Sequence, residues 1–378
     1  MKVSILTQPL GRNYGGLLQA YALQVAVKKL GCDVETLDRR KTQSHHFFAI
    51  SKVKTLIKKI LRFIDFMGYW RKLGNPYANL DNFRDHFISM SPLVDTERKV
   101  ASYYSDNRFD AFIVGSDQVW RSCYSPSLYN FFLDFCDNLD LSSKRIAYAA
   151  SFGVDYKEFS DEEVAFCRPL ARRFDAISVR EDSGVGLCKD YFDVNVKLVL
   201  DPTMLLEYAD YEHLIENDSS LKLEKAENLL VYVLDMEDKK QAFVEEVSRI
   251  TGESPTYLMN HPDGLRDESS KNNNLHPSVG DWLKNFKMAE FIVTDSFHGC
   301  VFAIIFNKPF FALGNKSRGL ARFNSLLKIF GLENRLIDSF EEVDESLISN
   351  SIDWDKVNKI RDSERNKSIE FLKNSLFS

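Results

Sequence analysis

The sequence predicts an α/β protein made of two Rossmann-like domains, whose parallel sheets face each other across a cleft. The chain has 378 residues, more than one ordinary hydrophobic core needs and enough for two domains. Short apolar runs recur along it, and each run leads into a turn of polar or small residues. Nearly all-apolar strands are typical of parallel sheets that are covered on both faces. These observations together favour two parallel-sheet domains.

The N-terminal part of the chain predicts a strand–helix–strand unit. VSILT (3–7) is rich in β-branched and apolar residues and leads into a loop at 8–16. Residues 17–31 have apolar side chains at helical spacing and end at Gly31, and 33–38 form the next expected strand. Because such crossovers are right-handed, the two strands are expected to be parallel.

Further strands follow along the chain, each running into a polar or small-residue turn. They are expected at 110–117, 144–153, 174–181, 196–203, 229–235 and 289–296. A helix closed by Gly252 and a long charged C-terminal helix complete the pattern. In open α/β sheets, ligands bind just outside the carboxyl ends of the strands, so these turns are where a site is expected.

The chain is expected to divide into an N-terminal Rossmann-like domain over residues 1–178 and a second one over 179–350. The polar region at 204–228 is expected to bridge one half to the next. Residues 351–378 form a terminal helix that we expect to pack back on the first domain.

Composition narrows the class of protein. The net charge of −6 gives no general attraction to nucleic acid, so we expect no nucleic-acid partner. Six scattered cysteines without a C-x-x-C pair indicate reduced thiols. The N-terminus is expected to be a core strand rather than a signal peptide, and no apolar run approaches the ~20 residues of a membrane span. We therefore expect a cytoplasmic protein.

A glycine-containing loop precedes the first helix and is a candidate substrate-binding element. Asn13, Tyr14, Gly15 and Gly16 lie between the first strand and that helix. Glycines let the backbone approach a ligand closely, and helix-start N–H groups favour anions or hydroxyl oxygens. The loop matches neither G-x-G-x-x-G nor a P-loop, so nucleotide binding has little support. A tight turn without a ligand explains the loop equally well.

Two further strand ends carry polar groups that suit a sugar or an anion. Ser116 and Asp117 follow a buried strand in GSDQVW (115–120), where Asp117 can accept a proton from a sugar hydroxyl or, alternatively, cap a helix. Arg180 ends another strand, and its planar guanidinium can bind two oxygens of a carboxylate or phosphate together. An ion pair with Glu181, or one between the domains, explains Arg180 equally well.

TDSFHG (294–299) is the most specific of these stretches. The strand at 289–293 is expected to deliver Ser296 and His298 to the first turn of a helix at 299–306. Helix-end N–H groups, a hydroxyl and an imidazole then converge on one point, which predicts an anion site with a proton donor. A lone histidine is usually structural, but these neighbouring groups favour a functional one.

Two basic segments complete the candidates. Lys316 and Arg318 lie in GNKSRGLAR (314–322), which suits a loop that closes over a phosphate or, alternatively, a solvated surface loop. Residues 52–72 carry seven Lys/Arg and one Asp, with apolar residues at helical spacing. A basic amphipathic helix of this kind suits an anionic membrane surface, although an ordinary core-facing helix has the same stripe.

Taken in order, these stretches resemble the polysaccharide pyruvyl transferase family. The resemblance rests on ILTQPLGRNYGGLLQAYAL, FIVGSDQVW, KRIAYAASFG, ISVRE, LVLDPT and TDSFHG. It implies a GT-B-like fold, with the acceptor side in the first domain and the donor side in the second. It also implies transfer of the enolpyruvyl group of phosphoenolpyruvate onto a sugar of a surface polysaccharide precursor, commonly as a pyruvate ketal with release of phosphate.

The resemblance further implies that Arg180 and His298 lie in the donor site, and their chemistry suits that role. Phosphoenolpyruvate carries a carboxylate and a phosphate, so two anion-binding elements are needed. Arg180 can bind one, and Ser296 with the helix start, or the loop at 314–322, can bind the other. His298 is the candidate acid that protonates the methylene carbon or neutralises the departing phosphate, and Asp117 is the candidate base for the acceptor. No metal or cofactor is expected.

Two other functions stay open at this point. A GT-B glycosyltransferase that uses a nucleotide sugar would need a base-and-ribose pocket in the second domain, and no motif for one can be recognised. A non-catalytic sugar-binding protein with the same fold is the second. No motif identifies the acceptor sugar or decides between a ketal and an enolpyruvyl ether. If the acceptor is lipid-linked, residues 52–72 are expected to bind the membrane surface beside it.

Overall fold

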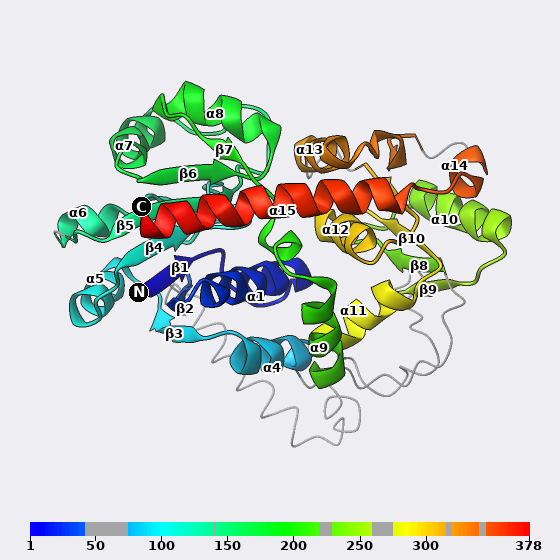
Figure 1. Cartoon of the computed structure of the whole chain (residues 1–378), viewed down its shortest axis with the longest axis horizontal. Helices are drawn as coiled ribbons and strands as arrows, with labels where there is room; N and C mark the ends of the chain where they lie inside the picture. Colours follow the sequence, from blue (N-terminus) through cyan, green and yellow to red (C-terminus); the bar gives the residue numbers. More distant parts are fainter. Residues whose placement is uncertain (42–74, 140, 219–228, 259–274, 315–318, 340–344) are drawn as a thin grey trace, which may run out of the picture.

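Two parallel sheets form the frame of the protein (Figure 1). The structure is a computed structural model that describes residues 1–41, 75–139, 141–218, 229–258, 275–314, 319–339 and 345–378. Within these ranges, one sheet has seven strands in the order β3-β2-β1-β4-β5-β6-β7, and the other has five in the order β12-β11-β10-β8-β9. The predicted architecture of two parallel-sheet α/β domains is confirmed.

The strands that build the sheets are short and largely buried. The first sheet contains β1 (Lys2–Leu6), β2 (Asp33–Arg39), β3 (Met90–Val94), β4 (Ala111–Val114), β5 (Lys144–Ala150), β6 (Ala176–Val179) and β7 (Lys197–Leu198). The second contains β8 (Leu229–Tyr232), β9 (Pro255–Tyr257), β10 (Phe291–Thr294), β11 (Phe310–Leu313) and β12 (Leu336–Ile337). The central strands β4, β8, β10 and β11 are buried along their whole length, as their apolar sequences require.

Helices connect and cover these strands (Figure 1). Those of the first half are α1 (Tyr14–Lys29), α4 (Ala78–Phe87), α5 (Glu97–Asp106), α6 (Asp134–Asn138), α7 (Asp161–Ala171), α8 (Asp182–Phe192) and α9 (Tyr208–Asp218). Those of the second half are α10 (Asp238–Thr251), α11 (Val279–Met288), α12 (Phe297–Ile305), α13 (Ala321–Phe330), α14 (Glu345–Ser349) and α15 (Trp354–Phe377). The expected stop of α10 at Gly252 is confirmed, because this residue adopts the left-handed conformation that ends many helices.

The division between the sheets lies further along the chain than the expected boundary between residues 178 and 179. β6 and β7 both belong to the seven-stranded sheet, in which Ile146 of β5 pairs with Ala176 of β6. Arg180 therefore follows a strand of the first sheet, where the expectation had placed it in the second domain. Apolar strands of either sheet look alike in sequence, since only pairing decides which sheet a strand joins. We propose that the domains follow the sheets, with the passage between them after β7.

The first helix begins earlier than expected. α1 starts at Tyr14, and the Oδ1 atom of Asn13 caps it by accepting a hydrogen bond from the N–H of Gly15 at 3.0 Å. The glycines of the expected loop therefore form the first helical turn. Tyr14 is buried, stacks on Trp282 of α11 with ring centroids 5.4 Å apart, and donates its O–H to the carbonyl of Pro277 at 2.8 Å. These contacts pack the start of α1 against the second half of the chain.

The C-terminal helix α15 runs along both halves of the molecule (Figure 1). Near its end, Leu372 and Leu376 join a hydrophobic cluster that contains Val3 of β1. Near its start, Val357 joins a cluster that contains Ile304 of α12. The helix therefore contacts the core of the first domain, as expected, and also the core beside the second sheet.

In the part of the chain that the structure describes, no helix is long and apolar enough to cross a membrane. The basic segment 52–72, for which a membrane-binding helix was predicted, lies outside the described residues. Its contact with a membrane stays a prediction.

Candidate active site

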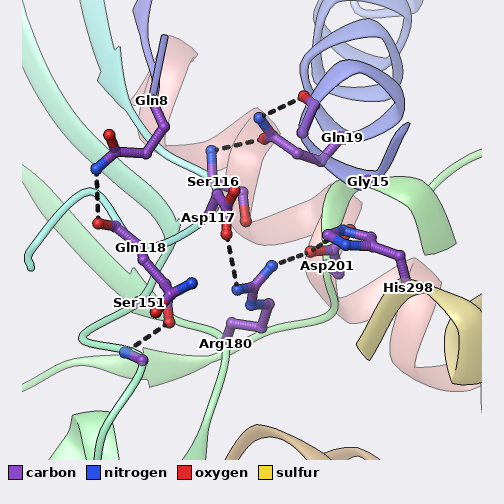
Figure 2. A network of polar contacts seen from close by, with 12 residues as sticks. Gln8, Gly15, Gln19, Ser116, Asp117, Gln118, Ser151, Arg180, Asp201 and His298 are labelled. Carbon is purple, nitrogen blue, oxygen red and sulfur yellow. Dashed lines mark hydrogen bonds and ion pairs between the residues drawn. The ribbon is translucent and has the colours of Figure 1, made fainter. Parts of the chain in front are cut away.

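A cluster of polar side chains lies where strand ends of the two sheets come together (Figure 2). From the first sheet come Asp117 after β4, Arg180 after β6 and Asp201 after β7. From the second comes His298, in the first turn of α12, which follows β10. The carboxyl ends of parallel strands share one edge of a sheet, which is why residues far apart in sequence meet here.

Arg180 lies at the centre of this cluster. Its side chain is 2% exposed, its Nη1 donates to Oδ2 of Asp201 at 2.6 Å, and its Nη2 donates to Oδ1 of Asp117 at 3.4 Å. The guanidinium also lies 4.5 Å from the ring centroid of Phe297. Burial alone would lower the pKa of Arg180, but the neighbouring carboxylates, Asp201 foremost, raise it. The guanidinium therefore stays charged. Of the ion pairs considered from the sequence, the one with Glu181 is present at 3.9 Å. The pairs with Asp117 and Asp201 were not expected.

Asp201 joins Arg180 to His298. Its Oδ1 accepts hydrogen bonds from the N–H and the hydroxyl of Thr203, at 3.0 and 2.6 Å. Its Oδ2 accepts from Arg180 and lies 3.7 Å from Nε2 of His298. Burial would raise the pKa of this carboxyl, but His298 and Arg180 hold it well below its usual range. One ionised carboxylate therefore bonds to a guanidinium and lies within ion-pair distance of an imidazole (Figure 2).

His298 lies directly against the start of α1. A Cβ atom on Gly15 would lie 2.0 Å from Nδ1 of His298, closer than any real contact. Only glycine leaves room for the imidazole in its present position. The glycine predicted to admit a ligand thus admits a side chain from the second half of the chain, and the contact fixes His298 beside Asp201.

Three buried polar atoms in this cluster have no hydrogen-bond partner among the residues that the structure describes. They are Nε of Arg180, Oε2 of Glu181 and Nε2 of His298. Nε of Arg180 and Oε2 of Glu181 are 3.9 Å apart, too far for a hydrogen bond. Because buried polar groups nearly always have partners, unpaired groups that converge indicate a place where a ligand or water binds. Two of these residues are the ones expected in the donor site.

Other predicted binding residues hydrogen-bond and pack on the elements that carry the cluster. Ser116 is fully buried; its hydroxyl donates to the carbonyl of Ala149 at 2.9 Å, and its N–H donates to Oε1 of Gln19 at 3.1 Å. Asn13 and Tyr14 hold the start of α1, as described above. These contacts position Asp117 and Gly15, and direct contact of the three supporting residues with a substrate stays a prediction.

The turn before α12 is held rigidly. Ser296 caps the helix by accepting a hydrogen bond from the N–H of Gly299 at 3.4 Å. The carboxylate of Asp295 pairs with Lys240 at 2.8 Å and also accepts N–H bonds from the loop after β8. The predicted placement of Ser296 and His298 at a helix start is therefore confirmed. Substrate contact by the Ser296 hydroxyl stays a prediction.

A second arginine lies close to Arg180. The guanidinium of Arg322, at the start of α13, is 5.9 Å from the ring centroid of Phe297. Burial, together with the charge of Arg180, lowers the pKa of Arg322 to about 10, which leaves it protonated at neutral pH. Lys316 and Arg318, the predicted cations of the preceding loop, lie outside the described residues.

Asp201 and Glu181 are members of this cluster that the sequence did not single out as site residues. Oε1 of Glu181 accepts hydrogen bonds from the hydroxyl of Ser151 at 2.7 Å and from the N–H of Phe152 at 3.0 Å. Asp201 directly follows the apolar run of LVLDPT, and Glu181 follows Arg180 at the end of ISVRE. Position at the end of a parallel strand was therefore the available indication of their role.

Replacing Asp201 by asparagine is expected to lower the free energy of unfolding by about 3–5 kcal/mol at pH 7, because the buried charge of Arg180 loses its partner. The folded-state pKa of Asp201 is lowered, so its contribution is present above the unfolded pKa of about 3.9 and is lost as pH falls. The difference between wild type and variant, measured by urea unfolding, should therefore be constant near neutral pH and shrink below about pH 4.

A matched control for this prediction is the exposed carboxylate of Asp193. It pairs with Lys189 and Arg172 on the surface and is 60% exposed. Asp193→Asn should change the free energy of unfolding by no more than about 1 kcal/mol, because surface ion pairs contribute little. If the two substitutions change the free energy of unfolding equally, the buried ion pair of Asp201 stabilises the protein no more than a surface ion pair does.

The two linked parallel-sheet domains define a protein of the GT-B fold. The buried cluster of arginine, histidine and carboxylates at the strand ends is its candidate anion site. The family model of polysaccharide pyruvyl transferases matches residues 13–317. The chain belongs to the polysaccharide pyruvyl transferase family. Asp117, Arg180, Asp201 and His298 all lie within the matched region.

Solved structures agree with the fold. UDP-GlcNAc 2-epimerase from Neisseria meningitidis, bound to UDP-GlcNAc, matches with 10% sequence identity and a TM-score of 0.53, covering 97% of this chain and 94% of that one. UDP-N-acetylglucosamine 2-epimerase from Rickettsia bellii matches with 11% identity and a TM-score of 0.51, covering 100% and 97%. At this level of identity the likeness concerns the fold alone. A comparison with curated proteins found no match.

Proposed function

We propose that this protein transfers the enolpyruvyl group of phosphoenolpyruvate onto a sugar of a surface polysaccharide precursor and releases phosphate, with a pyruvate ketal as the product. The family supports a pyruvyl transfer onto a polysaccharide sugar. The observation that carries the proposal is that Arg180 and His298, both buried, meet at Asp201, and that Nε of Arg180 and Nε2 of His298 have no hydrogen-bond partner among the described residues. In the proposed reaction phosphoenolpyruvate is itself the donor substrate, and no metal or cofactor is assigned a role.

The donor needs positive charge at two points, one for its carboxylate and one for its phosphate. Arg180 supplies one, and its unpaired Nε is available to an oxygen atom. Arg322, whose guanidinium also lies over the ring of Phe297, supplies a second charge in the same cluster. The N-terminus of α12, capped by Ser296, adds the partial positive charge of a helix end. These groups support binding of a small dianionic or trianionic donor.

His298 is the proposed acid. A proton passes from its ring to the methylene carbon of the enol, which makes the adjacent carbon electrophilic. A sugar hydroxyl then forms a C–O bond to that carbon and gives up its proton, and the C–O bond to phosphate breaks. A second sugar hydroxyl then attacks the same carbon and gives up its proton to the released phosphate, which closes the ketal. A positioned acid of this kind contributes about 10²–10⁴ in rate.

Asp117 is the proposed base or orienting group for the acceptor. It belongs to the first sheet, its side chain is 13% exposed, and one oxygen lies 3.4 Å from Arg180. A carboxylate in this place can accept the hydroxyl proton while Arg180 holds it in line with the donor. The acceptor is proposed to approach from the first domain, and a lipid link on it stays a prediction.

The direct test is phosphate release from phosphoenolpyruvate, followed with a panel of monosaccharide and lipid-linked disaccharide acceptors. The proposal predicts release that depends on an acceptor and a product that carries the three carbons of pyruvate. Thermal-shift titrations with phosphoenolpyruvate and with UDP-sugars form the comparison. Stabilisation by a UDP-sugar alone, with no release from phosphoenolpyruvate, would favour a glycosyltransferase. Donor binding without turnover on any acceptor would favour a non-catalytic protein.

A further inference from the structure

A second hollow lies on the first domain, away from Arg180 and His298. It has a volume of about 550 Å³, within the range of roughly 300–1,000 Å³ that small-molecule pockets occupy. Its walls are the end of β2 with the chain just after it, the start of α5, the loop that follows β4 and one residue of α7. None of the residues of the candidate active site lines this hollow.

The hollow lies beside the topological switch point of the first sheet. In the order β3-β2-β1-β4-β5-β6-β7, the chain builds outward in one direction from β1 and in the other from β4. Ligands of open α/β sheets bind outside the carboxyl ends of the strands at this point. Arg39 ends β2 and Lys41 follows it on one side of this point, and Ser122 to Tyr129 follow β4 on the other. The hollow is therefore in the place where this topology forms binding sites.

The charges in its walls balance. Two cations, Arg39 and Lys41, face two carboxylates, Glu97 and Glu163. Arg39 donates hydrogen bonds to Glu97 at 2.7 Å and to Oδ1 of Asn130 at 2.8 Å, and these bonds hold its side chain in place in the wall of the hollow. A site without net charge favours a neutral ligand over a phosphorylated or acidic one. This distinguishes it from the cationic donor site around Arg180.

The remaining wall atoms suit a sugar ring. Ser122 and Ser127 have hydroxyl groups that make no hydrogen bond to the described residues, so they can donate to or accept from a ligand. Tyr129 also lines the hollow and packs on Phe166, with ring centroids 4.0 Å apart. Phe166 is 45% exposed, so this aromatic pair reaches the surface. Hydroxyl partners and aromatic faces together match a polyhydroxylated ring, which has polar edges and apolar faces.

A hydrogen-bond chain connects the hollow to the candidate active site. The hydroxyl of Ser125, in the wall of the hollow, accepts a hydrogen bond from Nε2 of Gln8 at 2.9 Å. The same Nε2 donates to the carbonyl of Gln118 at 2.7 Å, next to Asp117 (Figure 2). Gln8 therefore links the wall of the hollow to the turn that carries the proposed base.

We propose that this hollow binds a neutral sugar residue of the acceptor, adjacent in the saccharide to the residue that receives the pyruvyl group. That the bound sugar belongs to the acceptor rests on the proposed function. That the hollow binds a neutral saccharide rests only on the shape, charge and side chains of the hollow. Under this proposal, Ser127 and Tyr129 of the first domain contact the acceptor and determine which saccharide binds.

The test is the variant Ser127→Trp, whose indole would fill the hollow, against the control Ser142→Trp on an exposed position elsewhere in the first domain. Saccharide binding is measured by saturation-transfer NMR without donor, with p-nitrophenyl glycosides of glucose, galactose, mannose, N-acetylglucosamine and N-acetylmannosamine, and with their disaccharides. For any probe that supports phosphate release, the KM for acceptor and the KM for phosphoenolpyruvate are measured as well. If Ser127→Trp does not fold, Ser122→Trp takes its place.

The proposal predicts that the wild-type chain binds at least one neutral glycoside, and that Ser127→Trp weakens this binding, and raises the acceptor KM, at least about tenfold. The KM for phosphoenolpyruvate should stay unchanged, and Ser142→Trp should match the wild type. Unaltered saccharide binding in the folded Ser127→Trp variant, or no binding of any probe to the wild type, would overturn it. Failure of the proposed function looks different: saccharides bind and Ser127→Trp abolishes binding, but phosphoenolpyruvate supports no phosphate release.

Discussion

Replacing His298 by alanine is expected to lower kcat for acceptor-dependent phosphate release by about 10²–10⁴-fold, because the proposed reaction then lacks its positioned acid. His298 is 7% exposed, and its ring is fixed between Gly15 and Asp201. No other histidine lies among the residues that the structure places in this cluster. The measurement is the kcat and KM of wild type and variant under saturating phosphoenolpyruvate.

An exposed histidine provides the control for this substitution. His213 lies on α9 away from the cluster, so His213→Ala should keep the wild-type kcat. If His298 acts as the acid, kcat falls more than the affinity for phosphoenolpyruvate does. An unchanged kcat in His298→Ala would remove the residue from the chemistry and leave it a structural group of the junction.

Adding a single methyl group at Gly15 is expected to be almost as damaging. In Gly15→Ala the new Cβ would lie 2.0 Å from Nδ1 and 2.7 Å from Cε1 of His298, so the ring must leave its place beside Asp201. Displacement of a catalytic group by about 1 Å can cost about 10²-fold in rate. Phosphate release should therefore fall by about that factor or more, measured together with a thermal melt that reports folding.

The adjacent glycine is a close control for this experiment. A Cβ on Gly16 would meet Asn13 at 3.7 Å, an ordinary van der Waals contact. Both glycines lie in the first turn of α1, where alanine is favoured by about 1 kcal/mol over glycine. Gly16→Ala should thus be active and at least as stable as the wild type. Equal activity of the two variants would contradict the close packing of His298 on α1.

Apolar strand patterns and polar strand ends allowed most of the fold to be predicted from the sequence. The βαβ unit, the helix before Gly252 and the placement of Ser296 and His298 at a helix start all follow from local rules: hydrophobic period, left-handed stop residues and N-cap chemistry. The membership of β6 and β7 in the first sheet did not follow, because by their own composition these strands could join either sheet. Pairing between strands is a long-range property that one strand does not encode.

The candidate site was predictable in part for the same reason. Arg180 and His298 stood out because a guanidinium or an imidazole at a strand or helix end suits an anion. Asp201 did not stand out, because its importance comes from two partners far away in sequence, at 2.6 and 3.7 Å. Tyr14 and Ser116 were expected to meet a ligand, and the structure places them in packing and turn contacts that no local pattern distinguishes from binding.

The central claim, that the buried cluster around Arg180 is the phosphoenolpyruvate site, is tested most directly by calorimetric titration of phosphoenolpyruvate into the wild type and Arg180→Ala. A charged hydrogen bond contributes about 1.5–3 kcal/mol, so the account predicts binding to the wild type and an affinity about 10–100-fold weaker in the folded variant. Phosphoenolpyruvate binding that is the same in both proteins, or absent from the wild type, would contradict it.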